Sequence, residues 1–459
     1  MIENNARVLV VGMARSGIAA AKLLLRHGAV PLINDQKEED SFGDGLNCFY
    51  HTPCEFHLGE NPVHLLKTCD FVVISPGVPI DAPVVKEARE QGIPLIGELE
   101  LAYMYLKGRL IAVTGTNGKT TTATLLGKLF ENAGYTVRVG GNIGYPLCAI
   151  TLESKEDDIV VAEVSSFQLE TVQTFRPLAA ALLNITEDHL NRHHTMDAYA
   201  ALKRRIFENQ TAGDLAVINY DDPLTREIAG HLTPQVAYFS RLADVQHGVC
   251  LQGGTVVSVA NGIRTPICEA EDILIPGPHN LENAMAAAAI AVSMGIAPNI
   301  IKQTFQTFSG VEHRIETVRT VRGVTYINDS KGTNTASTLK AVDSMRAPTV
   351  IILGGYDKHT DFGVLSDAIK QSPFMMHAVL LGQTAQQIED SLKQYDFLDY
   401  TTAYSLEDAV AKAGNRAVPG GNVLFSPACA SFDMFRDYEH RGAVFKEIVN
   451  RLPETESAE

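Results

Sequence analysis

The stretch IAVTGTNGKTTTATLL, residues 111–126, places the tightest constraint on what this chain can fold into. An apolar run ends in a turn cornered by Gly115 and Gly118, and Lys119 and Thr120 follow where a helix should begin. The amides of such a turn and the positive end of the helix favour anionic oxygens. The stretch therefore predicts a strand, a phosphate-binding loop and a helix, as in a nucleotide-binding α/β domain.

Two side chains of this loop are expected to carry chemistry. Lys119 would reach the outer phosphates of a nucleotide, and Thr120 could ligate magnesium. The spacing departs from the general GxxxxGK[ST] loop, because Val113 stands where that pattern has its first glycine. The alternative is a glycine turn beside a surface lysine, and the preceding strand and the run of threonines argue against it.

Strand-like apolar runs alternate with helical stretches along most of the chain, which predicts α/β architecture with mostly parallel sheets flanked by helices. A length of 459 residues allows two to four domains at roughly 100–200 residues each. Changes in the pattern predict three domains, over residues 1–98, 99–310 and 311–459. The first and last are expected to be Rossmann-like, and the central one to be a P-loop ATPase domain.

Composition excludes several classes of function. The net charge is −16 and the longest basic run is KRR, so we expect no nucleic-acid partner. No apolar run reaches the ~20 residues that a membrane helix needs, so we expect no membrane partner. The seven cysteines are scattered and form no CxxC pair, which indicates neither a zinc site nor a disulfide framework and fits a cytoplasmic protein.

A weaker phosphate-binding pattern, GMARSG, lies near the amino terminus. Gly12 and Gly17 match the dinucleotide fingerprint, whereas Ala14 replaces its middle glycine. Asp35 lies near the spacing of a ribose-binding acid. An NAD site and a site for a nucleotide-diphosphate substrate are both compatible with this turn, and so is a glycine kept for packing alone.

Three residues of the central segment could belong to a metal site. Glu163 ends a strand-like run and is placed to hold magnesium beside the phosphate loop. His189 follows another strand-like run and either ligates a metal or caps and packs. Lys203, taken alone, would be a helix-surface lysine, because an ammonium group cannot bind a metal.

A series of motifs runs in one order along the whole chain and carries a resemblance to a known family. The motifs are GTNGKTT, GNIG, EVSSFQLE, NITEDHL, YAALKRRIF, HNLENA, EHRIE, NDSKGTN, LGGYDK and SPACASFDMFRDYEHRG. Together they resemble the ATP-dependent Mur ligases of peptidoglycan precursor synthesis. The central motifs are shared with folylpolyglutamate synthase, whereas NDSKGTN and the last motif are specific to the branch that adds D-glutamate.

The resemblance implies a UDP-sugar-binding first domain, an ATPase second domain and a third domain that brings the amino acid. It implies that ATP phosphorylates the carboxylate of UDP-N-acetylmuramoyl-L-alanine, and that the amine of D-glutamate attacks the acyl phosphate. A tetrahedral intermediate then collapses to the amide, ADP and phosphate. ATP and Mg²⁺ are the implied cofactors, and a cytoplasmic monomer is the implied form.

The resemblance also implies roles for individual residues. The implied catalytic residues are Lys119, His189, Lys203, Arg314 and Lys331. The implied ATP contacts are Gly115, Thr116, Asn117, Gly118, Lys119, Thr120, Thr121, Asn283, His313, Arg314, Asp329 and Lys331. The implied metal ligands are Thr120, Glu163, His189 and, as a carbamate, Lys203. The implied UDP-substrate contacts are Ser16, Asp35, Gly77 and Asn142, and those to D-glutamate are Thr333, Lys358, Ser431 and Tyr438.

Other functions remain open from the sequence. A folylpolyglutamate-type ligase or another Mur ligase would use the same ATPase core. An NAD-dependent dehydrogenase with an appended ATPase would use the amino-terminal turn differently. A P-loop ATPase switch would hydrolyse ATP without any ligase chemistry.

Overall fold

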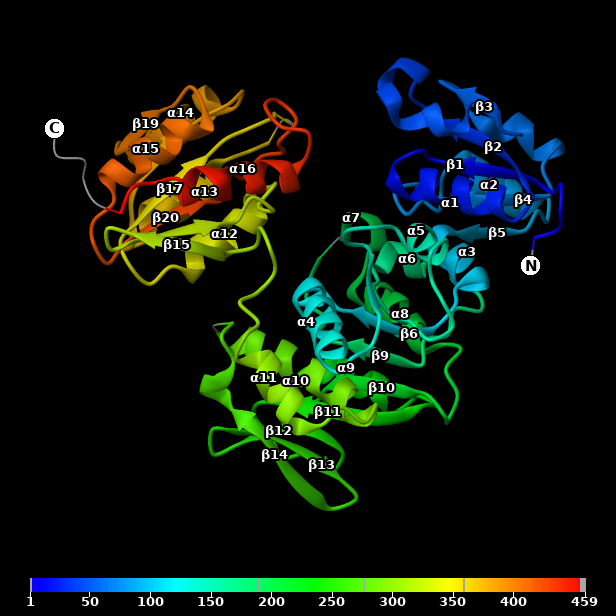
Figure 1. Ribbon diagram of the computed structural model, residues 1–459. Helices are drawn as coiled ribbons and strands as arrows, with labels where there is room; N and C mark the ends of the chain where they lie inside the picture. The colour runs from blue at the N-terminus through cyan, green and yellow to red at the C-terminus, as the bar shows by residue number, and fades with distance from the viewer. Residues whose placement is uncertain (1, 189, 276, 358–359, 455–459) are drawn as a thin grey trace. The chain divides into compact units, whose positions relative to one another are not determined.

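The computed structural model describes residues 2–188, 190–275, 277–357 and 360–454 (Figure 1). The chain forms two compact units, Met1–Phe308 and Ser309–Glu459, with two sheets in the first unit and one in the second. The predicted fold class, α/β with mostly parallel sheets flanked by helices, is confirmed. The domain boundaries at residues 98 and 310 stay predictions. Within the described part of the chain, no helix has the length and apolar character needed to cross a membrane.

The first sheet has five parallel strands in the order β3-β2-β1-β4-β5. The order reverses between β1 and β4, which is where open α/β sheets bind ligands. The strands are β1 (Arg7–Val11), β2 (Val30–Asp35), β3 (Glu55–Leu58), β4 (Phe71–Ile74) and β5 (Leu95–Gly97). The helices are α1 (Arg15–Arg26), η1 (Glu39–Phe49), η2 (Pro62–Lys67), α2 (Pro83–Glu90) and α3 (Glu98–Tyr105).

The second sheet has nine strands in the order β14-β13-β12-β11-β10-β9-β6-β8-β7. It is parallel from β7 to β12, and β13 and β14 extend it as an antiparallel hairpin. The strands are β6 (Arg109–Thr114), β7 (Val137–Gly141), β8 (Ile159–Glu163), β9 (Ala179–Leu182), β10 (Leu215–Asn219), β11 (Gln235–Ser240), β12 (Gly248–Gln252), β13 (Thr255–Ala260) and β14 (Ile263–Glu269).

Both faces of this second sheet are covered, which explains why its central strands read as continuous apolar runs. In β6, Leu110 and Ala112 pack into the core on one face, and Ile111 and Val113 into the core on the other. The helices are α4 (Lys119–Asn132), α5 (Leu147–Thr151), α6 (Ser166–Leu169), α7 (Leu190–His193), α8 (Met196–Arg204), η3 (Arg205–Phe207), α9 (Pro223–Ala229), η4 (Ala270–Asp272), α10 (Pro278–Ser293) and α11 (Pro298–Phe305).

The second unit holds a six-stranded sheet in the order β15-β16-β20-β17-β18-β19, parallel except for β15. The strands are β15 (Glu316–Val321), β16 (Val324–Asn328), β17 (Thr349–Leu353), β18 (Met375–Leu380), β19 (Tyr400–Thr402) and β20 (Asn422–Phe425). The helices are α12 (Thr335–Ser344), α13 (Gly363–Gln371), α14 (Ala385–Gln394), α15 (Leu406–Arg416) and α16 (Tyr438–Asn450).

A buried carboxyl group at the start of α3 makes the stability of the first unit depend on pH. Oε1 of Glu98 accepts a hydrogen bond from the backbone N–H of Cys148 at 2.6 Å, and Oε2 has no hydrogen-bond partner among the described residues. Burial raises the pKa of Glu98 from 4.5 to about 7. The folded state therefore holds a proton there that the unfolded state releases, and stability falls as pH rises from 4.5 to about 7.

We expect the variant Glu98→Gln to lose this part of the pH dependence, because glutamine keeps the acceptor but has no proton to release. The difference of about 2.5 pKa units corresponds to roughly 3 kcal/mol of unfolding free energy as an upper bound. Urea unfolding of both proteins at pH 5 and pH 8 measures it. Glu90→Gln, at an exposed position of α2, is the control. Parallel pH profiles for wild type and Glu98→Gln would contradict the prediction.

Candidate active site

The glycine loop between β6 and α4 has the geometry of a phosphate cradle. Gly118 has φ = +83°, a left-handed conformation that glycine adopts at little cost. The ammonium of Lys119 folds back over the loop and donates to the carbonyl oxygens of Gly115 at 3.0 Å and Thr116 at 2.8 Å. The loop therefore lets a ligand come close to its backbone and places a cation at the start of a helix, which is the arrangement that binds phosphate.

A buried carboxylate lies next to this loop. Glu163 ends β8, which pairs with β6, and its Oε2 accepts a hydrogen bond from the hydroxyl of Thr120 at 2.8 Å. Its Oε1 accepts from the side-chain amide of Asn142 at 2.8 Å. Parallel strands end at the same sheet edge, so three residues from distant parts of the sequence meet here. The side chain is a hard oxygen donor whose two hydrogen-bonding partners, Thr120 and Asn142, are neutral, a chemistry that suits Mg²⁺.

Lys203 is buried beneath the loop, which excludes the surface-lysine interpretation. The residue is 1% exposed, and its amine donates to the carbonyl oxygen of Gly115 at 2.8 Å. The amine also lies 4.5 Å from the ring centre of Tyr199, one turn earlier on α8. Burial, and secondly the nearby ammonium of Lys119, lower the pKa of Lys203 to about 7. The surroundings of this amine therefore favour its neutral form, which is the nucleophilic one.

Side-chain contacts from other strand ends and helices fix the loop. Asn184 follows β9 and brackets Asn117, accepting from its N–H at 2.8 Å and donating to its carbonyl oxygen at 3.2 Å. Asn283 of α10 lies against the loop, since a Cβ added to Gly118 would stand 2.1 Å from its Oδ1. The predicted ATP contacts Asn117 and Asn283 are thus beside the glycine turn. Thr121 follows Thr120 in the first turn of α4.

The predicted UDP-substrate contacts of the first sheet lie at its carboxyl edge. Ser16 is in the first turn of α1, and Gly77 is in the loop after β4. Asp35, at the end of β2, accepts from the backbone N–H of Met13 at 2.7 Å and of Lys37 at 3.0 Å. The carboxylate of Asp35 therefore orders the glycine turn directly, in addition to any contact with a ligand.

The second unit holds Arg314 in a strained turn. His313 has φ = +63° and Ile315 has φ = +45°, and a β-branched residue in this region is a genuine outlier. Asp329 supports the turn by accepting from the backbone N–H of Ile315 at 3.2 Å. Burial raises the pKa of Asp329 to about 6, although it also accepts from the hydroxyl of Ser426 at 2.6 Å. Strain of this kind is characteristic of functional sites.

Two residues predicted around ATP and D-glutamate lie together in the same unit. The ammonium of Lys331 lies 5.9 Å from the ring centre of Tyr438, and the backbone N–H of Lys331 donates to the carbonyl oxygen of His313 at 3.0 Å. Ser431 is buried in the loop after β20. Thr333 donates its N–H to the carbonyl oxygen of Lys331 at 2.9 Å. Two other predicted residues, His189 and Lys358, lie outside the described residues.

Four residues that order these loops, two in each unit, were not predicted from the sequence. Asn184 and Ser426 each follow a strand, and Tyr199 is four residues before Lys203 on α8, which puts both on one face. Arg441 is almost fully buried. Its guanidinium donates to the hydroxyl oxygen of Ser330 at 3.0 Å and to the carbonyl oxygen of Ser330 at 2.8 Å. Position after a strand and helical spacing could have identified the first three, whereas no local pattern marks a buried arginine.

Three family models match the chain in succession. The description "Mur ligase MurD-like, N-terminal domain" matches residues 6–97, "Mur ligase middle domain" matches residues 113–291, and "Mur ligase, glutamate ligase domain" matches residues 313–429. The matched ranges include most strands of the three sheets, the glycine loop and the turn at Arg314, whereas Ser431 and Tyr438 lie beyond the last range.

Curated relatives match almost the whole chain. A UDP-N-acetylmuramoylalanine–D-glutamate ligase of Alkaliphilus oremlandii is 44% identical, covering 97% of this chain and 98% of the relative. The protein of that name from Pelotomaculum thermopropionicum is 46% identical over the same shares. Among solved structures, the UDP-N-acetylmuramate-alanine ligase of Thermotoga maritima is similar with a TM-score of 0.58 and 19% identity, covering 97% of this chain and 99% of that one. At that identity the structural likeness shows the fold alone.

Proposed function

This chain belongs to the Mur ligase family, and we propose that it joins D-glutamate to UDP-N-acetylmuramoyl-L-alanine with the consumption of ATP. The ATP-dependent chemistry is that of the family as a whole, and the curated relatives of nearly equal length carry the names of the D-glutamate-adding enzymes. The reaction makes an amide in peptidoglycan precursor synthesis.

One structural observation supports the proposed phosphoryl transfer. Lys119, Thr120, Glu163 and Asn142 converge at the carboxyl edge of one sheet: Lys119 and Thr120 begin the helix after β6, Glu163 ends β8 and Asn142 follows β7. Transfer of a phosphoryl group to a carboxylate brings two anions together, and the repulsion must be offset by cations and positioning. The ammonium of Lys119 supplies one positive charge at the point where the outer phosphates would lie.

The residues present suit a magnesium ion. Glu163 is 2% exposed, and both of its carboxylate oxygens accept hydrogen bonds from neutral donors. Neither of these hydrogen bonds therefore balances the negative charge of the buried carboxylate. Glu163 and Thr120 would hold the ion, and Asn142 would orient Glu163. When bound, Mg²⁺ offsets the negative charge of the phosphate oxygens.

Lys203 fits the role of a carbamate. A neutral buried amine can add to CO₂, forming an N–C bond and releasing a proton, and the product carries an anionic oxygen pair. The carbamate nitrogen keeps one N–H, so the hydrogen bond to the carbonyl oxygen of Gly115 can persist. The modification replaces an ammonium group, which cannot ligate a metal, with a carboxylate-like group, which can.

We assign amino-acid binding to the second unit. D-Glutamate has two carboxylates, so its pocket needs cations or donors at two ends. Thr333, Ser431 and Tyr438 would supply hydroxyl groups at one edge of the sheet, and Lys358, which lies outside the described residues, would supply a cation. The bond from the hydroxyl of Ser330 to the carbonyl oxygen of Tyr438, at 2.9 Å, ties the two loops together. Arg314 suits the charge that builds on the transferring oxygens.

The amino-acid assignment predicts a sharp substrate preference. With UDP-N-acetylmuramoyl-L-alanine and ATP held constant, we expect ADP release with D-glutamate. We expect at least ~10²-fold less with L-glutamate, L-lysine or meso-diaminopimelate, because the pocket must bind both carboxylates of an amino acid with one configuration at its α-carbon. A coupled ADP assay, with mass spectrometry of the amide, measures this. Preference for L-glutamate would overturn the assignment, and ADP release without any amide would indicate an ATPase without ligase function.

A further inference from the structure

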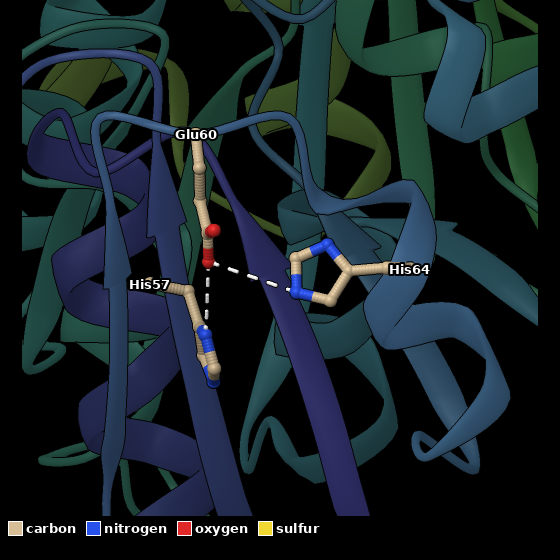
Figure 2. Close-up of side chains that lie close together, drawn as sticks. All are labelled: His57, Glu60 and His64. Carbon is tan, nitrogen blue, oxygen red and sulfur yellow. Dashed lines mark hydrogen bonds and ion pairs between the residues drawn. The ribbon is translucent and has the colours of Figure 1, made fainter.

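A cluster of two histidines and a glutamate lies at the carboxyl end of β3, away from the phosphate loop (Figure 2). Nδ1 of His57 is 3.0 Å from Oε1 of Glu60, and Nε2 of His64 is 3.8 Å from the same oxygen. Among the described residues, this is the one group of three or more such side chains whose ligand atoms all lie within 4.8 Å of one another. Figure 2 shows both rings directed at the Glu60 carboxylate.

These donors are those of a transition-metal site. Zn²⁺ binds imidazole nitrogen and carboxylate oxygen at about 2.0–2.2 Å, which places neighbouring ligand atoms about 3.0–3.5 Å apart. The His57–Glu60 separation of 3.0 Å already lies in this range. The side chain of His64 is 59% exposed, and its Nε2 lies 3.8 Å from Oε1 of Glu60, so a small side-chain movement brings it into the same range. Two histidines and one carboxylate leave a fourth position open to water, and Mg²⁺ would not prefer imidazole ligands.

The other ring nitrogen of His57 gives an independent indication. Nε2 is buried and has no hydrogen-bond partner among the described residues. It lies 3.7 Å from Oε2 of Glu55, which accepts a hydrogen bond from Arg7 at 2.9 Å. Metal-bound histidines usually direct their second N–H at a carboxylate, which fixes the tautomer. With an ion on Nδ1, the N–H at Nε2 would face Glu55.

The backbone that carries these ligands is anchored. The side-chain amide of Asn34 donates to the carbonyl oxygens of His57 at 2.7 Å and Glu60 at 3.1 Å, so a residue of β2 fixes both ends of the turn. Asn61 caps η2 by accepting from the N–H of Val63 at 3.2 Å, which sets the start of the helical turn that carries His64. The three ligands are thus presented by ordered backbone and need only side-chain adjustment.

The geometry points to a binding site for a divalent transition-metal ion of the Zn²⁺ type, formed by His57, Glu60 and His64 with Glu55 as the outer acceptor. The ion links the end of β3 to η2 and stabilises the edge of the first sheet. This site belongs to the first sheet and not to the phosphate loop of the second, and its test does not depend on ligase activity.

Zinc titration of the metal-stripped, full-length protein tests the site. With millimolar Mg²⁺ present to occupy magnesium sites, we expect calorimetry to show one Zn²⁺ per chain that the variant His64→Ala binds at least ~10-fold more weakly, since it lacks a ligand. Added Zn²⁺ should raise the Tm of the wild type and not that of His64→Ala. Bound Co²⁺ should give the visible absorption of a low-coordinate site in the wild type alone.

His231→Ala, at an exposed position of the same unit, is the matched control and should bind Zn²⁺ as the wild type does. Because the His64 side chain is exposed, its loss should leave the fold and the ligase rate unchanged, so a binding defect reports the site itself. Equal zinc affinity in wild type and His64→Ala, or no zinc binding by the wild type, would overturn the proposal.

Discussion

We expect ligase turnover to fall by about 10³-fold or more when Lys119 is replaced by methionine. The ammonium of Lys119 lies over the glycine loop, 3.0 Å and 2.8 Å from the carbonyl oxygens of Gly115 and Thr116. Methionine fills a similar volume without the charge, so the repulsion between the substrate carboxylate and the γ-phosphate is no longer offset. A coupled ADP assay at saturating substrates measures the effect on kcat.

The control for this experiment lies on the same helix. Lys128 is on α4, half-exposed, and pairs with Glu131 at 3.1 Å. Lys128→Met removes an equal charge from α4 far from its amino end, and we expect its turnover to remain within about twofold of the wild type, since surface ion pairs contribute little. If the Lys119→Met variant keeps more than a tenth of the wild-type rate, the proposed role of Lys119 in offsetting this repulsion is contradicted.

The second large effect is expected at Lys203. Lys203→Ala should lose about 10³-fold or more in turnover, because the proposed metal ligand and the hydrogen bond to the carbonyl oxygen of Gly115 are both removed. Truncation leaves a buried space next to the loop. Formate or acetate added at high concentration could occupy it and supply the missing carboxylate oxygens. We therefore expect these anions to restore part of the activity in a dose-dependent manner.

Two further measurements separate this role from a purely structural one. Arg204→Ala changes the exposed neighbour on α8 and should keep the wild-type rate and remain insensitive to formate. Protein exposed to ¹³C-labelled CO₂ should show a carbamate resonance that Lys203→Ala lacks. Full activity in Lys203→Ala would exclude the metal-ligand role. The modification would be excluded if Lys203→Ala is folded but inactive and formate does not rescue it. It would also be excluded if the wild type shows no carbamate resonance.

Local sequence was sufficient for the elements that carry the phosphate site. The apolar run before Gly115 is β6, and α4 begins at Lys119 as the glycine turn indicated. Glu163 was expected at a strand end and is the last residue of β8. Patterns of this kind are set by backbone preferences and by burial on two faces of a sheet, and both are written in neighbouring residues.

Other features of the site depend on residues distant in sequence. The turn around Arg314 has left-handed residues at His313 and Ile315, and nothing in EHRIE predicts a β-branched residue there. The strain is offset by hydrogen bonds that the turn donates to groups elsewhere, such as the Asp329 carboxylate. Arg441 was likewise unpredictable, because its burial is tolerated only where the carbonyl oxygens of Cys429, Ala430 and Ser330 converge on it.

The amino-acid sequence by itself determined the α/β class, the glycine loop with Lys119 and the strand-end position of Glu163, since each follows from short-range periodicity and turn chemistry. Tertiary structure alone decided that Lys203 is buried against Gly115, 88 residues away, and that burial lowers the pKa of its amine. The physical reason is that desolvation and charge repulsion depend on which groups the sheet order brings together, and a linear pattern does not contain those distances.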